Sequence, residues 1–425
     1  MSPRARRTKA QKKPSAKPGP KPGAAGRALR IRMYNVGFGD SFLLTVPAPD
    51  RDRKILIDCG VHPSGPGPRK IADVAQQIVA DVREGGTPRI DVVICTHRHA
   101  DHVSGFDDEI WKGVEVSEVW MPWTEDPTDP EARRIRESQS KAATHLTALA
   151  AQPGLAAQPT VAALAANALT NAGAMSTLHD GFSGSPARRF LPGPDRAKAT
   201  FTTDVLPGVK VHVMGPSRDA DVIRDMNPPA DEHYLRLAGG GGETGQKPTP
   251  PFDTSWAVPA SAVSPAARLS KADVADLGKL SDVDALALAV ALDQAVNGTS
   301  LLIMLQVGRS YLLLPGDAQW GTWRNAMADP EWRALLGQTS FYKVGHHGSH
   351  NATPKQLVEQ ILANDFYAMV STRAHTKTWD IPRGPLLTAL RKKSNRVARS
   401  DDADVPDATG FVRDGTKQVD LKLPV

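Results

Sequence analysis

The stretch ICTHRHADHVSG, residues 94–105, places three histidines and an aspartate within six positions: His97, His99, Asp101 and His102. The residues before them, RIDVVICT (89–96), are rich in β-branched side chains and predict a buried strand. The residues from Asp101 to about Trp111 predict a turn that enters a helix. The four side chains are therefore expected where a strand ends and a helix begins, which is where ligands bind in open α/β sheets.

The four side chains have the chemistry of metal ligands. Imidazole nitrogens and carboxylate oxygens bind Zn²⁺ and similar ions. The spacing suits two adjacent ions, one held mainly by His97 and His99, the other by Asp101 and His102. The alternative is a surface loop that is rich in histidine by chance. The chain has only 12 histidines, so three within six residues at a strand end favour the metal site.

Two later segments carry similar chemistry at predicted strand ends. YLLLPGDAQ (311–319) places Asp317 just beyond an apolar run, where a carboxylate could bridge two ions. Alone, an aspartate there is more often a helix N-cap. YKVGHHGSHN (342–351) places His346 and His347 beyond another run. Three strand ends with ligand chemistry together predict one convergent site.

These segments resemble the metallo-β-lactamase superfamily. The resemblance is closest to the hydrolase domain of the ComEC DNA-uptake protein and its free-standing relatives. The segments that carry it are NVGFGDSFLL (35–44), LIDCG (56–60), HRHADH (97–102), the Asn-x-x-Ser segment 297–300, LLLPGDA (312–318) and VGHHGSH (344–350). It covers roughly residues 30–125 and 295–395. It implies an αββα sandwich, two β-sheets flanked by helices, with the metals at one edge.

The resemblance also implies residue roles. The metal ligands would be His97, His99, Asp101, His102, Asp317 and one of His346 and His347. Asp101 and Asp317 would be catalytic, and Asp58 and Asp40 would orient ligands from behind. We expect His347 to be the ligand of its pair, because neighbours on an extended strand point oppositely and His347 lies further out. Substrate contacts are expected from Ser349, His350, Asn351 and His375, although the first three could instead cap a helix beginning near Thr353-Pro354.

One position departs from the superfamily pattern. The superfamily usually supplies a third histidine to the first metal from a strand end, and here the matching strand, VKVHVMGPSRD (209–219), ends at Gly215-Pro216. His212 within that strand is expected to be a core or face residue, and His179 is a looser candidate. ComEC-like relatives also tend to lack this histidine. The first ion could be weakly held, a single ion could suffice, or Mn²⁺ could replace the expected two Zn²⁺ ions.

The chain of 425 residues suits one large domain with insertions, or two domains. We assign residues 1–29 to a disordered basic tail and 30–425 to the hydrolase domain, with a helical and irregular insertion at approximately 125–295. Expected strands lie in 29–46 (flanking 37–40), 54–60, 116–123, 209–217, 297–319 (a hairpin turning near Gly308), 340–349 and 366–372. Expected helices lie in 69–84, 320–336 and 354–364. Cys59 and Cys95 follow apolar runs and predict buried, reduced thiols.

The net charge of +6 belongs to the tail. Residues 1–30 contain ten of the 52 Lys and Arg residues and no Asp or Glu, so the remainder carries 42 basic against 46 acidic residues. Such a Pro/Ala/Gly-rich tail cannot fold alone. It could contact nucleic acid or another anionic surface, or it could be a solvated extension. It lacks the apolar segment of a secretory signal, and no apolar run of 18 residues follows, so a cytoplasmic protein without a membrane span is expected.

Hydrolysis is the expected reaction class. Two cations about 3.5–4 Å apart can hold a bridging hydroxide and polarise a phosphoryl or carbonyl oxygen. The ComEC-like segments and basic tail favour a phosphodiesterase or nuclease. A small ester, lactone or phosphocholine-type substrate suits the acidic body about as well. The third alternative is a metal-bearing binding or toxin-immunity module with little turnover, which the missing histidine weakly supports and the otherwise complete ligand set opposes.

Overall fold

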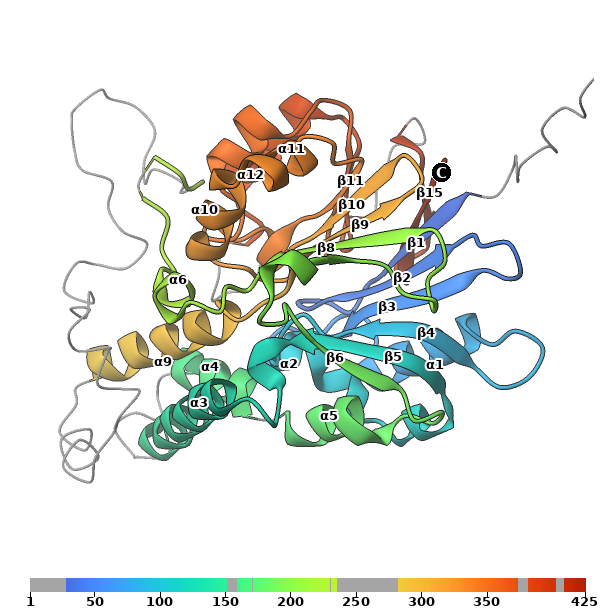
Figure 1. The fold of residues 1–425 in the computed structure, drawn as a ribbon. Helices are drawn as coiled ribbons and strands as arrows, with labels where there is room; N and C mark the ends of the chain where they lie inside the picture. Colours follow the sequence, from blue (N-terminus) through green and yellow to red (C-terminus); the bar gives the residue numbers. More distant parts are fainter. Residues whose placement is uncertain are drawn as a thin grey trace, which may run out of the picture.

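Two β-sheets pack face to face in the computed structural model (Figure 1). The structure describes residues 28–150, 159–169, 171–229, 231–234, 282–373, 381–402 and 409–425. Within them, one sheet has eight strands and the other has seven. The predicted basic tail lies almost wholly outside the described residues, as does His375.

The first sheet is built around the chain's N-terminal strands. In order across the sheet, its strands are β14 (Phe411–Asp414), β15 (Gln418–Leu423), β1 (Leu29–Tyr34), β2 (Ser41–Val46), β3 (Arg53–Cys59), β4 (Arg89–Ile94), β5 (Glu115–Pro122) and β6 (Ala187–Leu191). The strands from β14 to β3 pair antiparallel, and those from β3 to β6 pair parallel. The ends of β3, β4 and β5 therefore lie at one edge.

The second sheet also has an antiparallel part and a parallel part. Its strands, in order, are β13 (Val397–Arg399), β12 (Tyr367–Val370), β11 (Phe341–Lys343), β10 (Ser310–Leu314), β9 (Leu302–Val307), β8 (Val209–Gly215) and β7 (Thr200–Phe201). The strands β10 to β13 run parallel, while β7 to β10 pair antiparallel. The hairpin predicted near Gly308 is confirmed, with Gly308 at a φ of 57° in its turn.

Apolar side chains from both sheets form the central core. Ile31, Leu44 and Ile57 of the first sheet pack in one cluster with Ile303 and Leu312 of the second, and all five are at most 1% exposed. Alternate side chains of a strand face opposite sides of its sheet, so the same strands also supply the outer faces. The side chains on the outer faces pack under helices, which explains why β2 and β3 are buried along their whole length.

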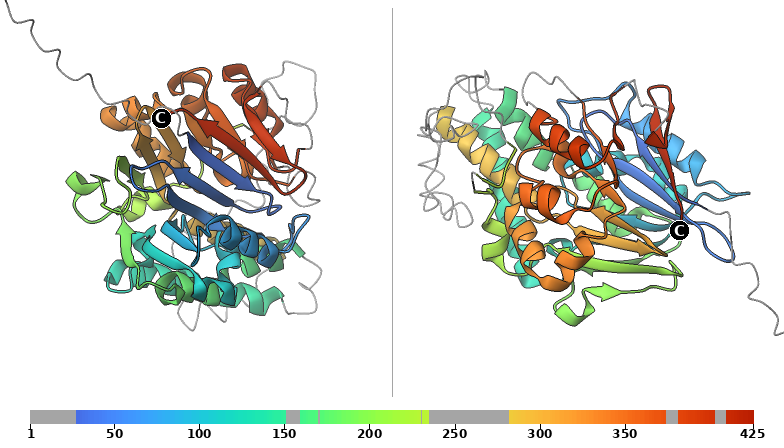
Figure 2. Two further views of the ribbon diagram at one scale, coloured as in Figure 1. Left: turned by 90° about the vertical axis from the view of Figure 1, so that its right-hand side faces the viewer. Right: turned by 90° about the horizontal axis from the view of Figure 1, so that it is seen from above.

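Helices cover both outer faces (Figures 1 and 2). The first sheet is covered by α1 (Ile71–Asp81), α5 (Ala172–Ser176) and the short turns η1 (Ser104–Asp107), η2 (Glu109–Gly113) and η4 (Thr177–Gly181). The second is covered by α10 (Trp320–Ala328), α11 (Pro330–Leu336), η9 (Leu357–Ile361) and α12 (Gly384–Lys393). The αββα sandwich implied by the resemblance is thus confirmed.

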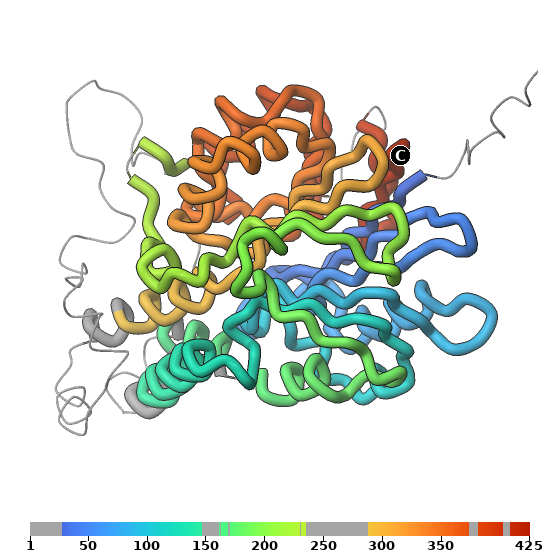
Figure 3. Tube along the Cα trace, viewed as in Figure 1, coloured from blue at the N-terminus to red at the C-terminus, as the bar shows by residue number. Residues whose placement is uncertain are grey.

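Three helices form a separate group beside the sandwich (Figure 3). They are α3 (Pro130–Ala150), α4 (Pro159–Leu169) and α9 (Asp282–Asn297), and they share a small apolar cluster that includes Leu146, Val161 and Leu292. The sequence assigns residues 125–295 to an insertion, and η3 (Trp123–Glu125) ends where this range begins. The range also contains β6, β7, β8, η5 (Arg196–Lys198) and α6 (Ala220–Arg224). β6 and β8 belong to the main sheets.

Several predicted elements differ from the structure. The helix expected over 320–336 is broken at Asp329, whose side chain caps α11 by accepting from the Glu331 and Trp332 amides. The strand expected over 340–349 ends at Lys343, and the helix expected over 354–364 is present over 355–361, of which the last five residues are η9. β14 and β15 were not among the predicted strands, and β15 pairs with the distant strand β1.

The remaining whole-chain expectations concern the thiols and the membrane. Cys59 and Cys95 are free and buried, as expected, and burial raises the pKa of the Cys59 thiol to about 12. Among the described residues, none of the helices combines the length and the apolar character that a bilayer crossing requires.

Candidate metal centre

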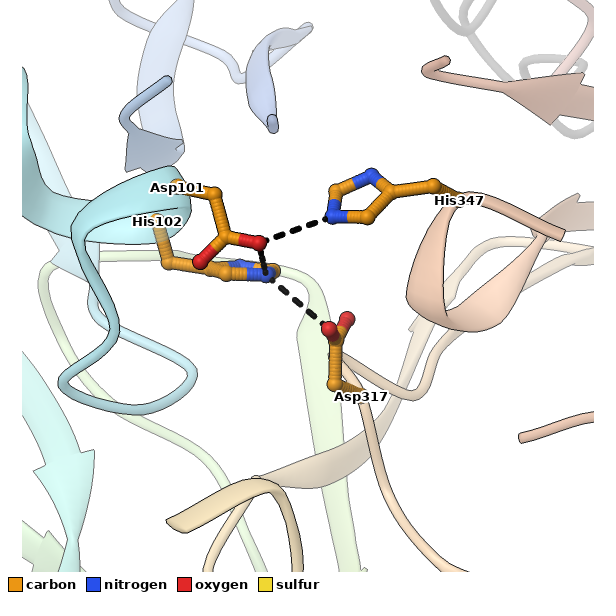
Figure 4. A group of neighbouring side chains, drawn as sticks. All are labelled: Asp101, His102, Asp317 and His347. Carbon is orange, nitrogen blue, oxygen red and sulfur yellow. Dashed lines mark hydrogen bonds and ion pairs between the residues drawn. The ribbon is translucent and has the colours of Figure 1, made fainter. Parts of the chain in front are cut away.

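The predicted ligands meet at the edge where parallel strands of both sheets end. His97, His99, Asp101 and His102 follow β4, Asp317 follows β10, and His347 follows β11. Ligand atoms of Asp101, His102, Asp317 and His347 all lie within 4.8 Å of one another. Figure 4 shows Asp101 and His102 entering from one side and Asp317 and His347 from the other. A second group, also within 4.8 Å, comprises His97, His99 and Asp101.

The hydrogen bonds of two histidines leave their Nε2 atoms available to a cation. His347 Nδ1 lies 3.0 Å from the carbonyl oxygen of Ser371, which can only accept, so Nδ1 carries the proton. His102 Nδ1 is held in the same way, 2.8 Å from Asp58 Oδ2. Each Nε2 lone pair then faces a carboxylate oxygen, Asp101 Oδ2 at 3.1 Å and Asp317 Oδ2 at 3.2 Å. Such partners behind a histidine fix its orientation and tautomer at metal sites.

The second group has a similar arrangement. His97 Nδ1 lies 3.3 Å from Thr96 Oγ1, and His97 Nε2 lies 3.1 Å from His99 Nδ1. Thr96 in turn donates both its amide and its hydroxyl to Asp58. Asp58 therefore supports both groups from behind, as the resemblance implied.

Buried polar atoms without hydrogen-bond partners test whether a cation fits here. They include Asp101 Oδ1, together with His102 Nε2 and Asp317 Oδ2, which face only each other as an ion pair. Leaving such atoms unsatisfied in a protein interior costs about 1–3 kcal/mol each. Divalent cations would satisfy them, because these atom types are their usual donors. The residues present thus fit one or two divalent ions.

The electrostatics divide the histidines into two classes. Burial lowers the pKa of His99 to about 4 and holds that of His97 well below its usual range. Burial alone would also lower the pKa of His102, but Asp317, Asp101 and Asp58 raise it well above its usual range. Burial alone would raise the pKa of Asp101, but the His102 imidazolium holds it well below its usual range. In the metal-free protein, the proton on His102 therefore supplies part of the positive charge that a bound cation would provide.

Close packing sets the position of the histidine loop. A β-carbon added at Gly60 would lie 2.4 Å from the Ala100 carbonyl oxygen and from the His102 amide nitrogen, so only glycine fits there. On the other side, Asn167 of α4 accepts a hydrogen bond from the Asp101 amide at 3.3 Å. The loop is therefore held between the end of β3 and a helix of the group beside the sandwich.

Asp40 belongs to a buried ion pair that the sequence analysis missed. Asp40 pairs with Lys343, a lysine with no exposed surface at the end of β11. The same carboxylate lies 3.6 Å from His102 Nδ1 and 3.8 Å from His347 Nδ1. A lysine within an otherwise apolar strand was the available sequence signal, because a buried cation requires a partner.

The backbone at His346 and His347 corrects the strand argument. Both residues lie in a turn with φ values of 46° and 54°, so the alternation of an extended strand does not apply. They differ instead in depth. His347 is fully buried among the Asp101 group, whereas the His346 side chain is 15% exposed, with Nε2 3.7 Å from Asp317 Oδ2. The His346 amide also donates to Asp317 Oδ1 at 3.1 Å and so orients that carboxylate.

The other candidate residues lie around the loop or away from it. Ser349 donates to Asn351, and Asn351 donates to Gln319, so these buried side chains brace the loop. His350 is half-buried, and burial together with the nearby Arg383 lowers its pKa to about 3. His212 lies in β8, with Nδ1 3.0 Å from Thr200 Oγ1, and His179 packs against Phe190. Neither histidine belongs to the two ligand groups.

A known family matches the N-terminal part of the described chain. Residues 34–135, which contain Asp40, Asp58 and the histidine loop, match the family model described as the metallo-beta-lactamase superfamily. A solved structure of Zn²⁺-bound PqqB from Methylobacterium extorquens aligns over 93% of this chain and 100% of its own, with 12% sequence identity and a TM-score of 0.36. The comparison with curated proteins finds no match.

Proposed function

We propose that this protein is a metal-dependent phosphodiesterase that cleaves nucleic acid strands. The observation that carries the proposal is the convergence of two ligand groups, which share Asp101, at the edge of both sheets. The match of residues 34–135 to a superfamily of metal-dependent hydrolases supports the reaction class. The ComEC-like segments support the choice of a phosphodiester.

The chain's own residues would prepare the reaction. Two bound divalent ions would supply Lewis acidity, which activates water and polarises a phosphoryl oxygen. Asp317, beside His102 and His346, would help to hold an ion together with His102 and His347. Asp101 lies next to His347 and in both ligand groups, so its carboxylate would orient the attacking water. Asp58 and Asp40 hold the imidazoles in place throughout.

The nitrogen-bearing side chains of His346, His350 and Arg383 support the proposal of an anionic substrate. The Nδ1 atoms of His346 and His350 are buried and have no hydrogen-bond partner. Arg383 lies near His350, and its backbone amide donates to the Gly348 carbonyl oxygen. Nitrogen donors beside a metal centre are suited to the non-bridging oxygens of a phosphodiester. Partly exposed His346, whose pKa is lowered by burial, is placed to donate a hydrogen bond from its neutral ring to the leaving oxygen.

A small ester, lactone or phosphocholine-type substrate is the alternative. The mildly acidic composition of the chain outside residues 1–30 favours it, because a net negative surface repels nucleic acid. A third possibility is a metal-bearing module with little turnover. The two alternatives are outcomes of the same experiment.

A substrate panel tests the proposal. The purified protein, reconstituted with Mn²⁺ or Zn²⁺, is assayed on single-stranded DNA, RNA, bis(p-nitrophenyl) phosphate, p-nitrophenyl acetate and a homoserine lactone. We expect turnover of the three phosphodiesters, which the double variant His99→Ala/Asp101→Ala loses together with its metal while keeping its fold. Turnover of the ester or lactone alone would replace the proposal with the alternative. Full metal binding without turnover would favour the non-catalytic module.

A further inference from the structure

The group of His97, His99 and Asp101 lacks the third histidine of the superfamily pattern. His97 and His99 supply two imidazoles, and β8 ends at Gly215 without a histidine. Catalytic zinc sites usually have three protein ligands and one open position. The His99 side chain is only 1% exposed, so a further donor has to come from an element packed against it.

The C-terminal turn of α9 reaches this position. Asn297, the last residue of the helix, has its Oδ1 2.8 Å from His99 Nδ1. Asp293, one turn earlier on the same face, has its Oδ1 3.8 Å from His99 Nε2. Asn297 is 1% exposed, and the Asp293 side chain is 17% exposed. The carboxyl end of a helix also carries partial negative charge, which favours a cation there.

We propose that α9 completes the first metal position: the Asn297 amide oxygen replaces the third histidine, and Asp293 orients both Asn297 and His99. This inference rests on the metal centre of the proposed function. It extends that function by assigning a ligand from the helical group beside the sandwich.

The amide of Asn297 has only one orientation that suits its neighbours. Its Nδ2 donates to Asp293 Oδ2 at 3.2 Å, so its Oδ1 must face His99. His97 Nε2 lies 3.1 Å and Asn297 Oδ1 lies 2.8 Å from His99 Nδ1, which donates a proton to Asn297 in the metal-free protein. A bound ion would replace that proton and be shared by the three atoms. Donors that share an ion at about 2.0–2.2 Å lie roughly 3 Å apart, so these separations suit a common cation.

The remaining atoms of the pair also have consistent roles. With His99 Nδ1 facing the ion, its Nε2 carries the proton and points towards Asp293. A carboxylate behind a ligating histidine is a common support in metal sites. An amide oxygen is a harder donor than an imidazole, and oxygen ligands suit Mn²⁺ better than imidazole does. The first position should therefore accept Mn²⁺ more readily than a site with three histidines would.

Metal counting on full-length variants tests the assignment without relying on activity. Metal-free protein is titrated with Mn²⁺ or with Zn²⁺ by calorimetry, and retained metal is counted after gel filtration. We expect two equivalents for the wild type, one for Asn297→Ala, and two again for Asn297→Asp, which keeps an oxygen donor. Asp293→Asn should keep two equivalents but bind the first-position ion about 10–100-fold more weakly.

Gln294→Ala is the matched control, because Gln294 lies on the same helical turn and bonds Asn227 instead of the ligands. It should bind metal as the wild type does. Thermal unfolding of each metal-free variant separates lost metal from a lost fold. Two equivalents retained by a folded Asn297→Ala protein would overturn the proposal, as would loss of one equivalent by Asp293→Asn alone. A protein that binds metal as expected but leaves phosphodiesters intact would refute only the proposed substrate.

Discussion

At the scale of single residues, the site depends on what lies behind each ligand. Asp58 joins Thr96 and His102, while Ser371 fixes His347. These contacts orient the ligand group of Asp101, His102, Asp317 and His347, so that its nitrogen and oxygen lone pairs face one another. The two adjacent histidines of the turn after β11 have different surroundings, and this difference makes their roles separable.

His347→Ala and His346→Ala should have different effects. His347 is buried against Asp101, so its variant should lose one equivalent of metal. His346 is partly exposed beside Asp317, so its variant should keep the metal but hydrolyse bis(p-nitrophenyl) phosphate about 10²–10⁴-fold more slowly. Metal content and rate are measured on the same samples. Equal metal loss in both variants would show that both histidines are ligands.

The metal-free protein should lose stability as the pH rises from about 6.5 to 8.5. The carboxylates around His102 raise its pKa in the folded state, and the Asp101 hydrogen bond raises that of His347 against the effect of burial. A raised pKa adds stability that is fully present below the unfolded value near 6.5 and is lost as the pH passes the folded value. Burial and the nearby Asp101 and Asp317 raise the pKa of Asp293 to about 8, which acts in the same direction.

Thermal unfolding in buffers of constant ionic strength measures this pH dependence. His97 and His99 do not confuse the result, because their lowered pKa values affect stability only below about pH 6.5. Saturating metal should reduce the loss, since cations replace protons at the same donors and bind more tightly as the pH rises. A metal-free protein whose unfolding midpoint is flat or rises over this range would contradict the electrostatic description.

At the scale of elements, parallel strands of both sheets end at the same edge of the sandwich, where the ligand groups lie. The site also depends on elements that follow no local pattern. β15 closes the edge of β1, with Ile31 opposite Leu421, although the two strands lie at opposite ends of the chain. Leu421 is 1% exposed and belongs to the central core.

Truncating Leu421 should therefore destabilise the whole fold. Leu421→Ala should lower the free energy of unfolding by about 2–5 kcal/mol, the usual cost of a cavity in a packed core. The neighbouring Lys422 is exposed, so Lys422→Ala should change it by less than about 0.5 kcal/mol. Urea denaturation followed by circular dichroism compares them. Equal, small effects would mean that β15 does not contribute to the core.

Local patterns predicted the parts of this fold that local chemistry determines. The apolar run before His97 and the hairpin at Gly308 have clear periodicity and turn residues, and both are confirmed. The three-residue strand β11 is too short to show a period, so its end was placed six residues too far. Contacts such as that of Asn297 with His99 join residues 198 positions apart. No local pattern reports such a contact, so the contacts of α9 with His99 and of Lys343 with Asp40 are visible only in the structure.

At the scale of the whole molecule, charge is divided between a basic N-terminal segment and a mildly acidic remainder. Residues 1–27 lie outside the described residues, and a role for them in binding nucleic acid is a proposal that rests on composition. Lysines and arginines that contact phosphates release counterions, so binding weakens as salt increases.

Deleting residues 1–28 should weaken binding of single-stranded DNA and flatten its salt dependence. The deleted segment contains nine basic residues and no predicted ligand. Hydrolysis of bis(p-nitrophenyl) phosphate should be unchanged, because β1 and the ligand groups remain. Fluorescence anisotropy at several salt concentrations measures the slope. An unaltered slope would show that the segment does not bind DNA.

As proposed above, the protein is a metal-dependent phosphodiesterase with two ion positions. The most direct measurement is the rate of bis(p-nitrophenyl) phosphate hydrolysis while metal-free protein is titrated with Mn²⁺, with bound metal counted at each point. We expect no turnover without metal and a rate that rises until two equivalents are bound. Two equivalents bound without hydrolysis, or hydrolysis by the metal-free protein, would contradict this proposal.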